Sequence, residues 1–190
     1  MAHLAALPEP LQQRLRAELN TGESLLWTGQ PSPRRYMKDA FKLWFFFIPW
    51  TAFSLFWMAG ASGFRLPSFE DGWSLFPLFG LPFLLIGIAG LSSPFWLRRK
   101  AAWIVYGLTN RRALIIAGKD SITVKSYQIA DIGELERTEH ADGSGDVIFE
   151  RESVRDSRGR QQTTNHGFIA VPEVRSVAQL LEKMTVARPA

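Results

Sequence analysis

The stretch YGLTNRRALII, residues 106–116, contains the pattern that decides the fold. Two short runs rich in β-favouring residues flank the pair Thr109-Asn110. This pair is typical of a tight turn, because asparagine tolerates a positive φ angle. The stretch therefore predicts a β-hairpin, with Arg111 and Arg112 near the start of its second strand.

Two long runs upstream of this hairpin contain no charged residue, namely residues 43–64 and 72–97. At about 1.5 Å per helical residue, either run is long enough to cross a hydrocarbon core of about 30 Å. A long segment precedes the first run, so a cleaved signal peptide is a poor interpretation of it. The sequence predicts an α+β membrane protein with a transmembrane hairpin over residues 43–97, its helices at about 43–64 and 73–97.

Basic residues flank the hairpin at both ends. Lys38 and Lys42, with Arg34 and Arg35, precede the first run; residues 98–100 (RRK) follow the second. The connector, residues 65–71, holds one base and two acids. The positive-inside rule therefore predicts that both termini are cytoplasmic and that the connector lies outside. Four tryptophans near the run ends suit an interfacial aromatic belt: Trp44, Trp57, Trp73 and Trp96.

The charge-free runs carry no chemistry of their own. They contain no ionisable residue that would mark an ion path, and two helices cannot enclose a pore, so transport is excluded. Small residues form one stripe along the second run: Gly80, Gly87, Gly90 and Pro94. We interpret this stripe as a surface on which the two helices pack closely; a partner site is the alternative.

The remaining sequence alternates between helical and strand periods. Leucines 7, 11, 15 and 19 share one helical face, and residues 23–29 suit a strand. After the membrane, strand-like runs separated by turn signals occupy residues 103–108, 112–117, 122–129, 134–140, 147–154 and 163–171. From Pro172 the period becomes helical, with apolar side chains at Val174, Val177, Ala178, Leu181 and Met184.

These patterns divide the chain into three parts. Residues 1–42 form a cytoplasmic helix and strand, residues 43–97 the hairpin, and residues 98–190 a strand domain capped by an amphipathic helix. Because the predicted topology returns both flanks to one compartment, we expect residues 23–29 to join the strand domain. Their three successive apolar side chains, Leu25 to Trp27, would otherwise stay exposed; lying in the membrane interface is the alternative.

The combination of GESLLWTGQP (residues 22–31) before the hairpin and YGLTNRRALII after it resembles the bacterial pleckstrin-homology (PH)-like family, in its membrane-anchored branch with paired helices. Residues 129–136 and 168–184 fit the same pattern. The resemblance implies a split β-barrel of about seven strands with a terminal helix, tethered to the bacterial inner (plasma) membrane as a multi-pass protein. It also implies a role in interactions, without naming a partner.

Five basic residues are candidate lipid or partner contacts: Arg98, Arg99, Lys100, Arg111 and Arg112. A basic residue near an anionic membrane surface contributes about 1 kcal/mol of binding energy. The alternative for Arg111 and Arg112 is solvation of the turn or capping of nearby carbonyls. The alternative for residues 98–100 is that they serve only the topology.

Other patterns do not amount to sites. Asp142, Ser144 and Asp146 match the start of a calcium loop, but its required glycine and bidentate glutamate are missing. His166 lacks the spacing of a metal ligand, and the sequence contains no cysteine and no nucleotide-binding or nucleophile motif. The charged run at residues 151–160 is interrupted by acids, so we interpret it as a solvated hairpin and expect no nucleic-acid binding.

Three classes of function follow. The leading one is a membrane-tethered interaction or assembly module that binds a protein partner or a copy of itself. The second is a reader of anionic lipid headgroups at the cytoplasmic leaflet. The third, an enzyme, is disfavoured because no catalytic constellation is visible. We expect no catalytic residue, cofactor, metal or small-molecule substrate.

Overall fold

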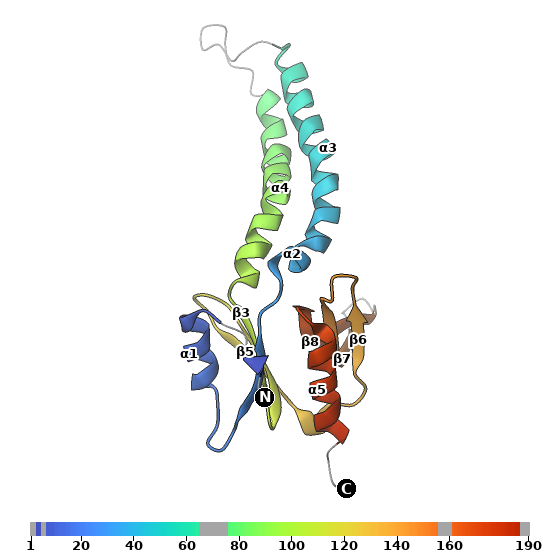
Figure 1. Cartoon of the computed structure of the whole chain (residues 1–190). Coiled ribbons are helices and arrows are strands. Elements are labelled where there is room, and N and C mark those ends of the chain that lie inside the picture. The colour runs from blue at the N-terminus through green and yellow to red at the C-terminus, as the bar shows by residue number, and fades with distance from the viewer. Residues whose placement is uncertain (1–2, 5–6, 65–75, 156–160, 187–190) are drawn as a thin grey trace. The chain divides into compact units, whose positions relative to one another are not determined.

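The computed structural model describes residues 3–4, 7–64, 76–155 and 161–186. The chain forms two compact units. The hairpin unit comprises Met37–Arg98, and the sheet unit combines Met1–Tyr36 with Arg99–Ala190. Figure 1 shows that each unit has its own architecture: a pair of helices in the first, strands with short helices in the second.

The hairpin unit is built from helices α3 (Lys38–Ala61) and α4 (Leu81–Ala101), with the 3₁₀ turn η1 (Phe76–Gly80) before α4. The segments Phe41–Ala61 and Pro77–Ala101 are long and apolar enough to cross a membrane. Only 11% and 17% of an 18-residue apolar stretch in each is buried, unlike the core helix of a globular domain. The first helix begins earlier than predicted and includes Lys38 and Lys42. The connector at residues 65–71 and Trp73 lie outside the described residues.

Close helix packing explains the small-residue stripe. A Cβ atom added at Gly80, Gly87 or Gly90 would lie 2.2–2.3 Å from a side chain of α3. The prediction that this stripe packs the two helices together is confirmed. Trp44 also has a role beyond the predicted aromatic belt, because its Nε1 donates a hydrogen bond to the carbonyl of Leu91, 2.9 Å away on α4.

The sheet unit contains two sheets. The first has the strand order β1-β2-β3-β4-β5 and is antiparallel except for the β1–β2 pair. Its strands are β1 (His3–Leu4), β2 (Leu25–Gly29), β3 (Ile104–Thr109), β4 (Arg112–Ala117) and β5 (Thr123–Gln128). The second, antiparallel sheet consists of β6 (Glu136–Glu139), β7 (Gly145–Arg155) and β8 (Gln161–Val171). The helices of this unit are α1 (Glu9–Ala17), α2 (Pro33–Tyr36), η2 (Ile129–Asp131) and α5 (Val174–Val186).

Successive residues of β3 and β4 point to opposite faces of the first sheet, and both faces are packed against other parts of the unit. On one face, Val105 and Leu114 pack against Leu11 and Leu15 of α1. Gly107 permits this approach, since a Cβ there would lie 2.6 Å from Leu15 Cδ1. The apolar face predicted for the N-terminal helix is therefore confirmed.

The other face borders the main core, which joins both sheets to α5. Phe168 is fully buried at its centre, with ring centroids 5.4, 5.0 and 5.3 Å from Trp27, Tyr106 and Phe149. Helix α5 adds its apolar stripe to this core, and Figure 1 shows it lying alongside the second sheet. The stripe predicted for the C-terminal helix is confirmed, although the helix begins at Val174 and leaves Pro172 outside its first turn.

The predicted strands all form, with shifts of a few residues at their ends. β2 pairs with β3 from Leu25↔Thr109 to Gly29↔Tyr106, so the prediction that residues 23–29 join the strand domain is confirmed. The sequence did not indicate β1, a two-residue strand, or α2, a single helical turn. Both elements are too short to show a period.

Candidate functional site

The Thr-Asn-Arg-Arg turn binds the segment that precedes β2. The Glu23 carboxylate accepts hydrogen bonds from Arg112 Nε at 2.8 Å and Nη2 at 3.0 Å, and from Thr109 Oγ1 at 2.7 Å. The Glu23 side chain is 0% exposed and that of Arg112 is 14% exposed. The geometry is bidentate, which is the strong form of an arginine–carboxylate pair. We call Glu23, Thr109 and Arg112 the clamp.

Further bonds complete the same contact. Asn110 Oδ1 accepts from the Ser24 amide at 3.0 Å, and the Asn110 amide donates to the Ser24 carbonyl at 3.0 Å. Arg112 Nη2 also donates to the Glu18 carbonyl at 2.6 Å. The two sequence stretches quoted for the family resemblance therefore bind each other directly. Their composition is explained by assembly of the fold, with no ligand required.

The clamp predicts an acid-sensitive stability. Hydrogen bonds from Arg112 lower the pKa of Glu23 from 4.5 to about 2. A lowered carboxylate pKa gives stability that is complete above about pH 4.5 and is lost as the pH falls toward 2, by about 3 kcal/mol at about 1.4 kcal/mol per pKa unit. We expect Glu23→Gln to lack this pH dependence. Urea midpoints of both proteins over a pH series test it, and parallel pH profiles would contradict the assignment.

The five predicted basic contacts do not form one cluster. Arg99 and Lys100 are exposed at the end of α4, while Arg111 and Arg112 follow Thr109 at the far end of β3. At about 3.3 Å per strand residue, β3 separates the two sets by well over 10 Å. Arg111 is exposed, whereas Arg112 forms an ion pair with Glu23. Arg98, the last residue of the hairpin unit, is exposed.

Two basic side chains that the sequence did not indicate gather instead around Trp103. The guanidinium carbon of Arg14 lies 5.3 Å from the Trp103 ring centroid, and Lys119 Nζ lies 5.9 Å from it. Both distances are in the range of cation–π contacts. These residues come from α1, the turn before β3 and the β4–β5 turn, so no local pattern could have revealed the cluster.

Asp142 of the acidic loop and His166 both contact neighbouring side chains. Asp142 pairs with Arg35 Nη2 at 2.9 Å and accepts from Ser144 Oγ at 2.6 Å. These bonds hold the pKa of Asp142 well below its usual range. His166 lies on β8 beside Lys125 Nζ at 3.4 Å and the Tyr127 ring. The described residues contain no group of three or more acidic or histidine side chains able to hold a metal.

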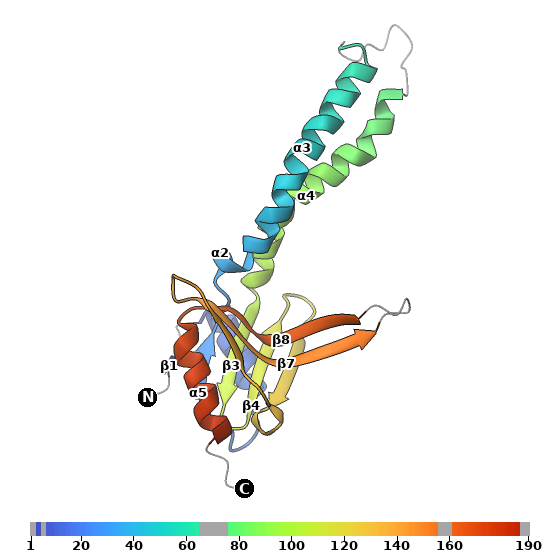
Figure 2. The same cartoon turned by 90° about the vertical axis from the view of Figure 1, so that its right-hand side faces the viewer.

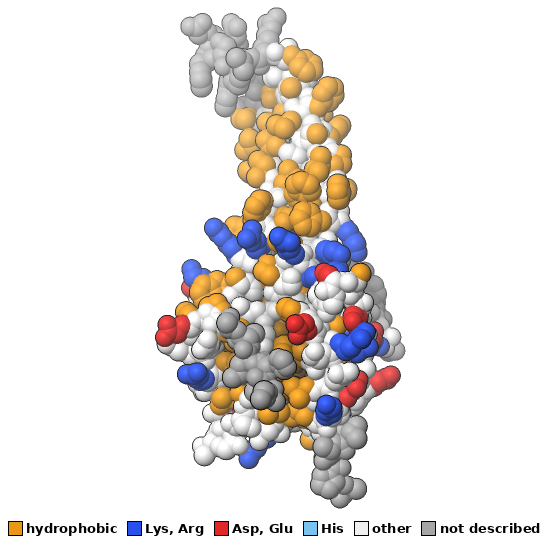
Figure 3. Space-filling view, in the orientation of Figure 1, with side chains coloured by type: hydrophobic (Ala, Val, Ile, Leu, Met, Phe, Trp, Pro, Cys, Tyr) orange, Lys and Arg blue, Asp and Glu red, His pale blue; other side chains and the backbone are white. Residues whose placement is uncertain are grey.

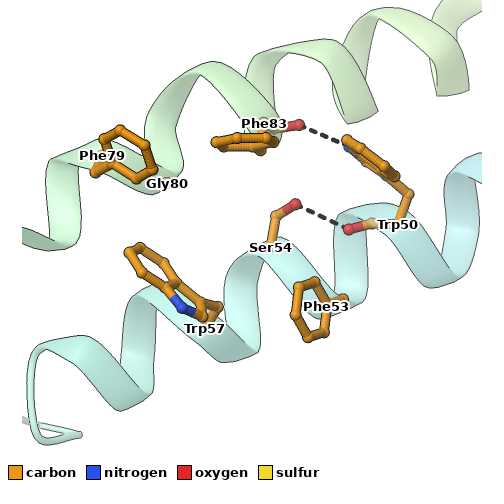
Figure 4. Close-up of a pocket in the computed structure, with 7 residues that line it drawn as sticks. All are labelled: Trp50, Phe53, Ser54, Trp57, Phe79, Gly80 and Phe83. Atoms are coloured by element: carbon orange, nitrogen blue, oxygen red, sulfur yellow. Dashed lines mark hydrogen bonds between the residues drawn. The ribbon is translucent and has the colours of Figure 1, made fainter.

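The hairpin unit contains a cavity of about 300 Å³. Figure 4 shows its mainly aromatic wall, contributed by α3, η1 and α4: Trp50, Phe53, Ser54, Trp57, Phe79, Gly80 and Phe83. Its polar atoms are engaged, since Trp50 Nε1 donates to the Phe83 carbonyl and Ser54 Oγ donates to the Trp50 carbonyl. With no titratable group in its wall, this cavity offers no acid–base or nucleophilic chemistry.

Strands β7 and β8 continue beyond the second sheet as a two-stranded ribbon. Pairing with β6 stops at Glu136↔Ile148, but β7 and β8 remain paired from Glu150↔His166 to Arg155↔Gln161. Figure 2 shows this ribbon extending away from the rest of the sheet unit. Its described side chains are exposed except that of His166. A groove of about 640 Å³ lies at its base, between residues 133–137 and Ile148 to Arg151 of β7.

Comparisons with known proteins do not assign this chain to a family. No family model, no curated protein and no solved structure matches the chain. The class that the described residues define is therefore an α+β protein with two antiparallel-type sheets and two helices able to span a membrane.

Proposed function

We propose that the chain is a membrane-tethered PH-like interaction module, which binds a protein partner at the cytoplasmic face of the bacterial inner membrane. The observation that carries the proposal is the two-stranded ribbon of residues 150–155 and 161–166, whose described side chains are exposed except that of His166. An isolated two-stranded ribbon is marginally stable in water and gains little from core packing. Such an arm is better explained by contact with another molecule than by stabilisation of its own fold.

The surface of the hairpin unit supports the membrane tether. Large apolar side chains are exposed along both helices, among them Phe45, Phe53 and Phe56 at 65–68%. Soluble monomers rarely expose an apolar patch of this extent. Figure 3 shows many apolar side chains gathered along the hairpin unit on the face in view. Lipid tails are the surroundings in which such a surface is stable.

The strand order supports the PH-like part of the proposal. The four antiparallel strands β2–β5, the three strands β6–β8 and the closing helix α5 follow the chain in that order. This is the count and sequence of elements that the family resemblance implies. Strand β1 and helix α1 are additions on the outer side of the first sheet.

The tether predicts a definite topology. Reporter fusions at residue 68 and at the C-terminus should report opposite compartments, with the C-terminus cytoplasmic. The physical reason is the set of basic residues that flank the hairpin, which are retained on the cytoplasmic side. Reports from the same side of the membrane would exclude the hairpin topology.

The free edge of β7 offers a mode of binding. Past Ile148, β7 has no partner strand on the side of β6 among the described residues. Unpaired N–H and C=O groups on such an edge can accept an added strand of another protein. The groove between residues 133–137 and β7 lies beside this edge and would receive side chains of that strand.

Shortening the ribbon separates binding from folding. We replace residues 151–165 by Asn-Gly, which favours a two-residue hairpin turn between Glu150 and His166. Because the removed described side chains are exposed, we expect the free energy of unfolding to change by less than about 1 kcal/mol. Partner binding, read as site-specific photo-crosslinking in native membranes, should be lost.

The crosslinking experiment has an internal control. A photo-reactive residue at Ser153, on the ribbon, should give a discrete product, whereas the same residue at Glu182, exposed on α5, should not. Residue 150 remains in the shortened protein and can also carry the photo-reactive group. A crosslinked product from that position after ribbon shortening would show that the partner binds outside the ribbon. Equal products from Ser153 and Glu182 would contradict the ribbon as the binding surface.

A further inference from the structure

Three segments meet at Trp103, just after α4 ends. The Trp103 amide donates to the Lys100 carbonyl at 3.0 Å, and the Gly118 amide donates to the Trp103 carbonyl at 3.1 Å. Arg14 of α1 then donates to the carbonyls of Gly118 at 2.6 Å and Lys119 at 3.0 Å. These bonds hold residues 100–103, the β4–β5 turn and α1 of the sheet unit in one arrangement.

The cations in this arrangement are not paired with any acidic side chain among the described residues. Arg14 and Lys119 both lie over the Trp103 ring, so two positive charges lie close to one aromatic side chain. Arg99 and Lys100 are exposed directly before it. Asp120 follows Lys119 in the chain, yet in the described part of the protein no ion pair joins any carboxylate to these four cations. An anion placed here would relieve their mutual repulsion.

The place of this cluster in the chain indicates where the anion comes from. The segment able to span a membrane ends at Ala101, two residues before Trp103. Lys100 therefore marks the boundary at which the chain leaves the apolar layer, if the hairpin is the tether. Tryptophan and basic side chains both favour that boundary, where the ring meets the hydrocarbon and the charges meet headgroups.

We propose that Arg14, Lys119, Lys100 and Arg99 around Trp103 form a binding site for the phosphate of an anionic lipid headgroup. Arg14, held by two carbonyls and the ring, supplies a fixed charge, and Lys119 supplies a mobile one that closes on the phosphate. The inference depends on the membrane tether of the proposed function and is independent of the ribbon and its partner.

The test uses the purified full chain in a neutral detergent, with phosphatidylglycerol as the probe. Native mass spectrometry counts the lipid molecules bound to each chain as the lipid is titrated. Loss of one basic residue, worth about 1 kcal/mol near an anionic surface, corresponds to a roughly fivefold weaker affinity. We expect this for Lys119→Gln, recovery in Lys119→Arg, and unchanged binding in Arg111→Gln, an exposed arginine at the other end of β3.

The remaining arms identify the source of the phosphate. Inorganic phosphate in excess should leave phosphatidylglycerol bound, because the acyl chains of the lipid also contribute to its affinity. Displacement of the lipid by inorganic phosphate would assign the site to a free phosphate and overturn the lipid assignment. Equal affinities of Lys119→Gln and Arg111→Gln would overturn the site itself. The ribbon-shortening experiment tests the partner separately, so the two failures are distinguishable.

Discussion

A polypeptide that begins at Lys100 is expected to lose cooperative unfolding, although it retains most strands of the sheet unit. It lacks the segment that contains α1 and β2, which buries Leu7, Leu11, Leu15 and Trp27. At about 1.5–3 kcal/mol for each large side chain, their burial contributes about 6–12 kcal/mol. This is comparable to the whole net stability of a domain, about 5–15 kcal/mol. The loss also leaves one edge of β3 without its partner strand.

The matched comparison restores the missing elements without the hairpin. Residues 7–36 are joined to residue 100 by a flexible Gly/Ser linker, which replaces the hairpin unit. Backbone bonds such as Ser32 N to the Ala170 carbonyl, 2.7 Å, should then re-form. We expect this linked polypeptide to unfold in one urea transition, followed by circular dichroism. If the shorter polypeptide shows the same midpoint and the same cooperativity, assembly from both flanks of the hairpin is wrong.

Arg112→Ala is expected to destabilise the sheet unit by about 3–5 kcal/mol. The substitution leaves the Glu23 carboxylate, which is fully covered, without its main partner, and removal of one member of a buried ion pair costs about this much. It also removes the bond from Arg112 to the Glu18 carbonyl, which fixes the chain between α1 and β2. Urea unfolding of the full chain in detergent measures the effect.

Arg111→Ala is the matched control. Arg111 is the neighbouring residue and carries the same charge, but its side chain is exposed and makes no ion pair in the described part of the chain. Exposed substitutions of this kind change stability by less than about 0.5 kcal/mol. Equal urea midpoints for the two variants would show that the clamp contributes nothing, and that solvation alone explains both arginines.

The elements of the fold were largely predictable from local periods. The leucines of α1 and the stripe of α5 repeat at helical spacing, and the alternation in β3 and β4 flanks a Thr-Asn turn. These predictions succeeded because the spacing of apolar residues depends only on neighbours within one element and shows which of its faces is apolar. The glycine stripe of the hairpin was recognisable for the same reason, because only small side chains at regular spacing allow the two helices to approach each other closely.

The roles of individual charges were not predictable in this way. Arg111 and Arg112 are identical neighbours in the sequence, yet one is exposed and the other is bound to Glu23. The difference arises because β2 pairs with β3, which brings Glu23 next to a turn far along the chain. A single sequence carries no signal for which carboxylate arrives there.

The sequence by itself determined the apolar hairpin, the strands and the two amphipathic helices, since each depends on neighbours within a few residues. Only the tertiary structure decided which basic residues are structural and which are available to a ligand. Arg14 and Lys119 come together at Trp103 because α1 packs on the outer face of the first sheet, beside the β4–β5 turn. Long-range packing sets such contacts, and a local pattern does not record it.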